Sequence, residues 1–162
     1  MRSINIQTLK RILWVLLILN MAAIFALSAQ PADLSTEETD VVISLPKHLF
    51  DRAHPELADD YDILKLFRFV VRKTAHFMEF ATLSVWAGGL LILYRCPRPY
   101  VWAALFSALY ALTDEFHQTF VPGRECKISD LVIDGSGAVF GALVLWLVVR
   151  QYRKANRKII AK

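Results

Sequence analysis

Four long apolar runs constrain the fold of this 162-residue chain more than any other feature of its sequence. They cover residues 12–29, 77–94, 100–113 and 131–149. A helix needs about 20 residues to cross the hydrocarbon core of a bilayer, and three of the runs approach that length. The third crosses only if the polar residues as far as 118 complete it. With 56% hydrophobic residues, the composition is too apolar for an ordinary soluble domain. We therefore expect an all-α integral membrane bundle of four transmembrane helices.

The expected spans, polar ends included, cover residues 12–29, 76–94, 100–118 and 131–149 of a single domain. The segment 30–75 between the first two spans is mixed in composition and acidic over its first half.

Three prolines, Pro31, Pro46 and Pro55, should break any long helix in the first half of this segment. We expect a surface excursion with short helical pieces there. The stretch 62–73 then predicts an interfacial amphipathic helix, on which Lys65, Arg68 and Arg72 form one basic stripe. The stripe has two interpretations, a snorkelling anchor at the interface or the rim of a site for an anion. For Lys65 and Arg68 we favour the anchor.

Basic residues without acidic neighbours predict the orientation. They are Arg2, Lys10, Arg11, Arg95, Arg98, Arg150, Arg153, Lys154, Arg157, Lys158 and Lys162. Because such residues stay on the inner side of a membrane, we expect a multi-pass protein of the inner (plasma) membrane with both termini cytoplasmic. The net charge of +4 then reflects topology and attraction to anionic lipid, and no nucleic acid is expected as a partner.

Two features of this topology have consequences of their own. The first run, which ends in small residues, also resembles a cleavable signal peptide, and that alternative stays open. Cys96 should lie in the inner turn and Cys126 in an outer loop, so the topology excludes a disulfide between them.

Every acidic residue of the chain falls on the outer side of these spans. Glu79, Asp114, Glu115 and Asp134 lie inside the apolar runs or at their ends. An aspartate at the centre of a span costs about 2.5–3.5 kcal/mol on insertion scales, and less near the boundary. Such carboxylates at one depth of one bundle indicate a functional site.

Helical spacing gathers these carboxylates with other polar side chains. Arg72, His76 and Glu79 stand at i, i+4 and i+7, on one face of the second span. Asp114, His117 and Gln118 share a face of the third span, and Glu115 aligns with Gln118.

The fourth span carries a stripe of its own. Asp130, Asp134, Gly137 and Gly141 stand at i, i+4, i+7 and i+11. Small residues so spaced let another helix approach closely, so this face should point into the bundle with its carboxylates. Asp130 and Arg72 are either interfacial anchors or a mutual salt bridge.

This set of side chains suits acid–base chemistry beside an anion. His76 and Glu79 with Asp114 and His117 can exchange protons, and Arg72 and Arg124 offer forked donors to phosphate or carboxylate. An anionic lipid headgroup or a lipid-linked envelope precursor fits such a site. The same two His–carboxylate pairs would be the ligands of any metal, and the sequence identifies no cofactor.

These residues resemble the VanZ-like family. The resemblance rests on Ser28-Ala-Gln30, Arg72-Lys-x-x-His76-Phe-x-Glu79, Asp114-Glu-x-His-Gln118, Pro122-Gly-Arg124, Ser129-Asp130 and Asp134. It implies a small bacterial integral membrane protein, and the namesake of the family is linked to resistance to the glycopeptide teicoplanin. By position it marks as candidate catalytic residues His76, Glu79, Asp114, Glu115, His117 and Asp134. It marks as candidate substrate-binding residues Ser28, Gln30, Arg72, Lys73, Gln118, Arg124, Ser129 and Asp130.

Two other functions remain open. In a structural or regulatory membrane subunit, the polar cluster would only lock helices together. An ion-coupled transporter component would need polar residues across the whole bilayer, yet the inner halves of the spans are apolar apart from Asn20.

Overall fold

The computed structural model of the chain describes residues 5–58 and 60–160, with side chains as far as residue 156. Arg2 and Lys162 of the basic clusters lie outside the described residues, as do the side chains of Arg157 and Lys158. Within the described part, all regular structure is helical. Its elements are α1 (Ile6–Ser28), α2 (Ala32–Ala53), the short 3-10 helix η1 (Pro55–Leu57), α3 (Tyr61–Leu93), α4 (Pro99–Gln118) and α5 (Ile128–Ile160). The all-α prediction is confirmed.

Three of these helices are long and apolar enough to cross a membrane, namely α1, α3 and α5 as far as Asn156. They make the chain a membrane protein by length and composition. The expectation of four such helices is met only in part, because α4 is not among them. Its 20 residues include polar side chains from Asp114 to Gln118, which lower its mean hydropathy.

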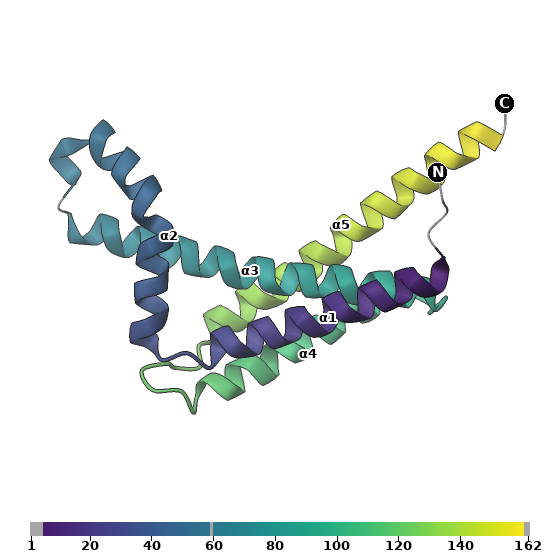
Figure 1. Cartoon of the computed structure of the whole chain (residues 1–162), viewed down its shortest axis with the longest axis horizontal. Helices are drawn as coiled ribbons and strands as arrows, with labels where there is room; N and C mark the ends of the chain where they lie inside the picture. Colours follow the sequence, from purple (N-terminus) through teal and green to yellow (C-terminus); the bar gives the residue numbers. More distant parts are fainter. Residues whose placement is uncertain (1–4, 59, 161–162) are drawn as a thin grey trace.

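Four helices, α1, α3, α4 and α5, form an elongated bundle (Figure 1). The beginning of α1 and the end of α5 lie at one end of the bundle, here called the terminal end. At the opposite end, the pocket end, α2 lies across the direction of the other helices beside the loop 119–127. The central helix is α3, which packs against each of the other α-helices.

Glycines let α3 and α5 cross in close contact. A Cβ atom at Gly137 would overlap the carbonyl oxygen of Phe77, and one at Gly141 would overlap that of Ala81. Asp134, one turn before Gly137, is fully buried. The prediction that this stripe of α5 faces the bundle with its carboxylates is therefore confirmed.

The apolar core lies between α1, α3 and α4. Phe80 and Leu83 of α3 are fully buried, with Ile24 of α1 and Ala103 and Ala111 of α4 packed around them. This core holds the ends of three helices in register, so the polar side chains that adjoin it on α1, α3 and α4 meet at the pocket end.

The segment 30–75 differs from its prediction. Pro46 lies inside α2, which runs for 22 residues and bends along its length (Figure 1). A proline removes one backbone hydrogen bond and kinks a helix. Here α3 contacts both halves of α2, through the pair of Arg68 with Asp40 and the packing of Phe67 on Phe50. The stretch 62–73 is the beginning of α3 and no separate helix. With 33 residues, α3 is about 50 Å long and extends beyond the hydrocarbon core.

Tight connections close the bundle at each end. Arg95 and Arg98 take left-handed backbone conformations in the turn between α3 and α4. Gly123, in the loop 119–127, has a φ of 73°, as its Pro-Gly pair predicts. Cys96 and Cys126 are free thiols in these two connections, at opposite ends of α4.

Candidate functional site

A polar pocket of about 230 Å³ lies at the pocket end of the bundle. Helices α1 to α4 and the loop 119–127 all contribute to its wall. Seven of the residues singled out by sequence line it, namely Ser28, Gln30, Arg72, His76, Glu79, Asp114 and Arg124. The remaining lining is largely apolar, with Ile24, Leu27, Val42 and Val71 among it. This pocket can therefore accept a molecule that is partly polar and partly apolar.

A second, larger pocket adjoins the first and shares Arg72, His76 and Arg124 with it. Its volume is about 590 Å³, and we call it the basic pocket. Its charged lining comprises Lys65, Arg68, Arg72, Lys73, Arg124 and Lys127 on the basic side and Glu125 and Asp130 on the acidic side. Positive charge therefore predominates, and Lys65 and Arg68, in the first part of α3, line this pocket.

Ion pairs neutralise several of these cations. Arg68 makes two 2.7 Å hydrogen bonds to the carboxylate of Asp40 in α2. Lys73 pairs with Asp130. Arg72 has no ion-pair partner among the described residues. The salt bridge with Asp130, one of the two alternatives predicted for Arg72, is made by Lys73 instead. The positive charge of Arg72 is thus left to the two pockets.

Arg124 connects the loop 119–127 to the end of α1. Its Nε donates to the Gln30 carbonyl oxygen over 2.9 Å, and its Nη2 donates to that of Leu27 over 3.0 Å. Burial lowers the pKa of Arg124, and the positive charge of Arg72 lowers it further. The two guanidinium groups therefore repel each other across the pockets, and an anion between them would relieve that repulsion.

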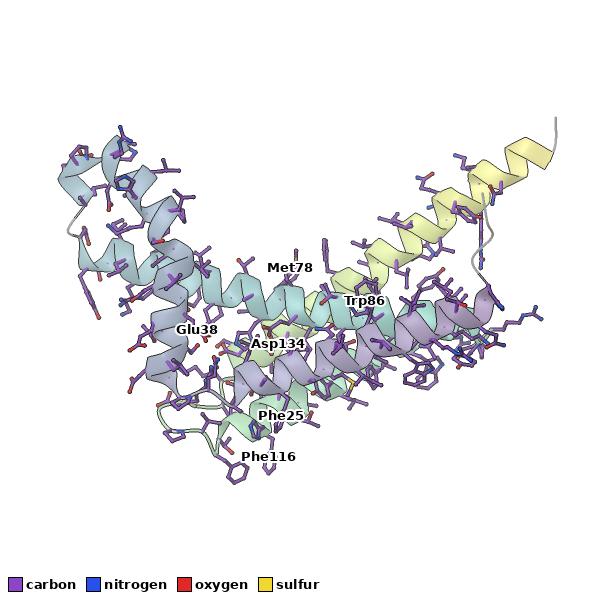
Figure 2. The ribbon with its side chains drawn as sticks, viewed as in Figure 1. Phe25, Glu38, Met78, Trp86, Phe116 and Asp134 are labelled. Atoms are coloured by element: carbon purple, nitrogen blue, oxygen red, sulfur yellow. The ribbon has the colours of Figure 1, made fainter. Side chains whose placement is uncertain are left out.

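Asp134 lies behind His76, on the side away from the pockets. Its Oδ1 is 3.5 Å from Nδ1 of His76, and the carboxylate is fully buried. Figure 2 shows Asp134 inside the bundle. Within the described part of the chain, neither carboxylate oxygen makes a hydrogen bond. Because Nδ1 of His76 faces this carboxylate, Asp134 can orient the imidazole ring with Nε2 turned away from it.

Asp114 and Gln118 join the two pockets along one face of α4. Gln118 Nε2 donates to Asp114 Oδ2 over 2.9 Å, and both side chains are buried. Asp114 lines the polar pocket and Gln118 lines the basic pocket. Their predicted common face is confirmed.

Glu115 and His117 lie outside both pockets. Glu115 Oε2 accepts a 2.9 Å hydrogen bond from the backbone nitrogen of Lys127, so this carboxylate holds the loop before α5. The ring of His117 packs on Phe25 of α1 at a centroid distance of 4.5 Å. The structure thus separates these two predicted catalytic residues from the pockets.

Lys73, Ser129 and Asp130 form a group at the edge of the basic pocket. Ser129 Oγ donates to Asp130 Oδ1 over 3.0 Å, and Lys73 pairs with the same oxygen. The group fastens the first turn of α5 to α3 and also lines the pocket.

The described residues contain no group of three or more His, Cys, Asp or Glu side chains arranged to hold a metal ion. The four residues named as possible ligands, His76, Glu79, Asp114 and His117, are not gathered into such a group. His117 is occupied with Phe25.

Sequence reasoning missed the contribution of α2. Ser35, Glu38, Thr39 and Val42 line the polar pocket, and their spacing of i, i+3, i+4 and i+7 places them on one face of a helix. Glu38 Oε1 accepts a 3.0 Å hydrogen bond from Nε2 of Gln30. The sequence contains that helical spacing, but the prolines of this segment predicted that no long helix would form there.

No curated protein and no solved structure matches the chain. The family model described as VanZ/LLP1 matches residues 13–149, which include all the candidate site residues. The resemblance noted from the motifs is therefore confirmed, and the chain belongs to the VanZ/LLP1 family.

Proposed function

We propose that this protein binds an anionic lipid or a lipid-linked cell-envelope component at the pocket end of its bundle, through the phosphate of that ligand. The observation that carries the proposal is Arg72, a cation without an ion-pair partner among the described residues, in the wall shared by the polar and basic pockets. Lys65 and Arg124 add positive charge around it. Arginine forks suit phosphate oxygens because they can bind two at once.

The polar pocket supports the same kind of ligand. Its carboxylates, Glu38, Glu79 and Asp114, can accept hydrogen bonds from hydroxyl or ammonium groups of a headgroup. Its apolar lining, with Ile24 and Val42, suits the first carbons of a lipid chain. In this arrangement His76, oriented by Asp134, is the group that exchanges a proton with the ligand, since histidine titrates near neutral pH.

The proposal includes a topology with four transmembrane helices in the inner membrane. The 20 residues of α4 give a length of about 30 Å, enough to cross the hydrocarbon core. The basic residues near both termini and at Arg95 and Arg98 then lie in the cytoplasm, and the pockets face the outer leaflet.

Thiol labelling tests this topology with the two natural cysteines. In intact cells, a membrane-impermeant maleimide should label the single-cysteine variant Cys96→Ser, which keeps Cys126 in the outer loop. It should label Cys126→Ser only after permeabilisation. The reverse pattern, or labelling of both in intact cells, would contradict the proposed topology.

Lipid titration followed by native mass spectrometry tests the site. We expect Arg72→Ala to weaken binding of phosphatidylglycerol about tenfold or more, because hydrogen bonds to charged groups contribute about 1.5–3 kcal/mol. Binding of zwitterionic phosphatidylcholine should change much less. The matched control is Arg153→Ala, an exposed cation of α5 at the terminal end. Equal affinities for phosphatidylglycerol in Arg72→Ala and the control would contradict the proposal.

A role in glycopeptide resistance is part of the proposal, because binding an envelope component can change the target of such a drug. Expression of the chain in a susceptible bacterium should raise the inhibitory concentration of teicoplanin, and Arg72→Ala should abolish the increase. If the unaltered chain does not change the inhibitory concentration, the role in resistance is contradicted. The proposal of lipid binding is tested separately by the lipid titration.

A further inference from the structure

We infer that α2 is a membrane-surface helix, which rests with one apolar side on the lipid leaflet at the pocket end of the bundle. The side consists of Leu34, Val41, Leu45 and Leu49, here called the α2 stripe. These four side chains are 45%, 75%, 66% and 58% exposed. The inference concerns how the protein meets the bilayer and does not depend on the proposed ligand.

The α2 stripe has the pattern of an interfacial helix. Its members follow one another at steps of seven, four and four residues, so they share one side of the helix. Thr39 and Ile43, on another side, are buried. An exposed apolar stripe opposite a polar face is the arrangement by which helices bind in the plane of a membrane surface.

The chain itself places α2 at the membrane surface. Only the three residues 29–31 separate the end of α1, a candidate span, from the beginning of α2. The four Cα–Cα steps from Ser28 to Ala32 span at most about 14 Å, so α2 begins near the level at which α1 ends. The backbone nitrogen of Ala32 also donates to the Pro122 carbonyl oxygen over 3.2 Å, which holds this start beside the loop 119–127.

The direction of α2 fits a helix lying in the membrane plane. In Figure 1 its first half runs across the axis of the bundle, whereas α1 and α4 run along that axis. The pair between Arg68 and Asp40 fixes the middle of α2 to α3. The helix is therefore held sideways at the pocket end and is not free to extend into solvent.

The α2 stripe also faces in the direction of the membrane. Glu38 and Val42 adjoin the stripe on this side of α2, and both line the polar pocket together with Ile24 and Glu79 of the bundle. The Glu38 carboxylate is hydrogen-bonded there by Gln30. Figure 2 shows Glu38 on the side of α2 that faces the bundle. This side is thus turned toward the spans, and where α2 extends past them the same side meets lipid.

Cysteine labelling with an environment-sensitive fluorophore tests the inference. In the Cys96→Ser/Cys126→Ser background, Val41→Cys and Leu45→Cys carry a nitrobenzoxadiazole label on the stripe. Glu37→Cys and Ser44→Cys, also exposed but on the polar face, are the matched controls. The full chain is reconstituted into phosphatidylcholine vesicles with or without nitroxide-bearing lipid.

We expect the stripe labels to emit at shorter wavelength, to be quenched severalfold more by lipid nitroxide than the controls, and to be protected from aqueous iodide. Equal quenching of both faces by iodide would overturn the inference. Protection of the stripe labels from iodide and lipid nitroxide alike would also overturn it, because a protein partner would then cover the stripe. Phosphatidylglycerol binding by the same variants is measured as for Arg72→Ala. That measurement tests the proposed function, whereas the fluorescence tests only whether α2 lies on the membrane surface.

Discussion

Replacing Gly141 by alanine tests the close crossing of α3 and α5, on which the position of Asp134 beside His76 depends. A Cβ atom at Gly141 would overlap the carbonyl oxygen of Ala81 and lie 2.8 Å from its carbonyl carbon. These are backbone atoms of α3, so no side-chain rotation can relieve the overlap. The two helices must move apart for alanine to fit.

The chain provides a matched control in the same helix. A Cβ atom at Gly135 meets no atom within 4 Å. Both substitutions gain the helix propensity of alanine, which is about 0.8–1.0 kcal/mol relative to glycine. The difference between the two variants therefore isolates the overlap, and overpacking of this kind costs about 1–3 kcal/mol.

Reversible unfolding of the purified protein in mixed micelles measures this difference. Gly135→Ala should be as stable as the unaltered chain or slightly more stable, and Gly141→Ala should lose about 1–3 kcal/mol relative to it. Gly141→Ala should also weaken lipid binding, because the moved helix carries Asp134 away from His76. If both variants have the same free energy of unfolding, α3 and α5 do not cross as closely as described.

Three further perturbations follow from the contacts of the pocket end. The hydrogen bonds from Arg68 lower the pKa of Asp40, so their pair stabilises the docking of α2 above the ordinary carboxyl pKa and stops doing so as pH falls through the lowered value. In the unaltered chain, protease cleavage within α2 should therefore increase on acidification. Asp40→Asn should raise cleavage already at neutral pH, at a cost of about 0.2–1 kcal/mol in docking, and should abolish the increase on acidification. Lys73→Met should destabilise the protein more than the double variant Lys73→Met/Asp130→Leu in the same unfolding measurement, because the single change leaves a buried carboxylate without its partner; the opposite order would show that the pair is not required. Gly123→Ala should cost about 1–2 kcal/mol, since a residue with a side chain pays for a φ of 73°, and an unchanged free energy of unfolding would argue against that turn.

Much of this architecture follows from local pattern. The apolar runs predict α1, α3 and α5 because hydrophobicity over about 20 residues decides which segments lie in a membrane. The glycines of α5 predict the side that meets α3, and spacing predicts that Asp114 and Gln118 share a face. Each of these properties is contained within one helix.

The predictions differ from the structure where the outcome depends on contacts between two segments of the chain. Pro46 suggests a broken helix, yet α2 continues because α3 supports it. Asp130 has two basic candidates one residue apart on α3, and rotation of that helix decides for Lys73 over Arg72. The spacing of His117 places it with the polar residues of α4, but in the structure its ring packs on Phe25 of α1.

The sequence by itself thus determined the apolar helices α1, α3 and α5, the glycine face of α5 that meets another helix, and the set of polar side chains near one end of the spans. Only the tertiary structure decided which of those side chains share a pocket, that Arg72 stays without an ion-pair partner among the described residues, and that α2 covers the site. The reason is physical: periodicity defines directions around one helix axis, whereas a pocket depends on the rotation, crossing and depth of several helices, which are set by packing between residues far apart in the chain.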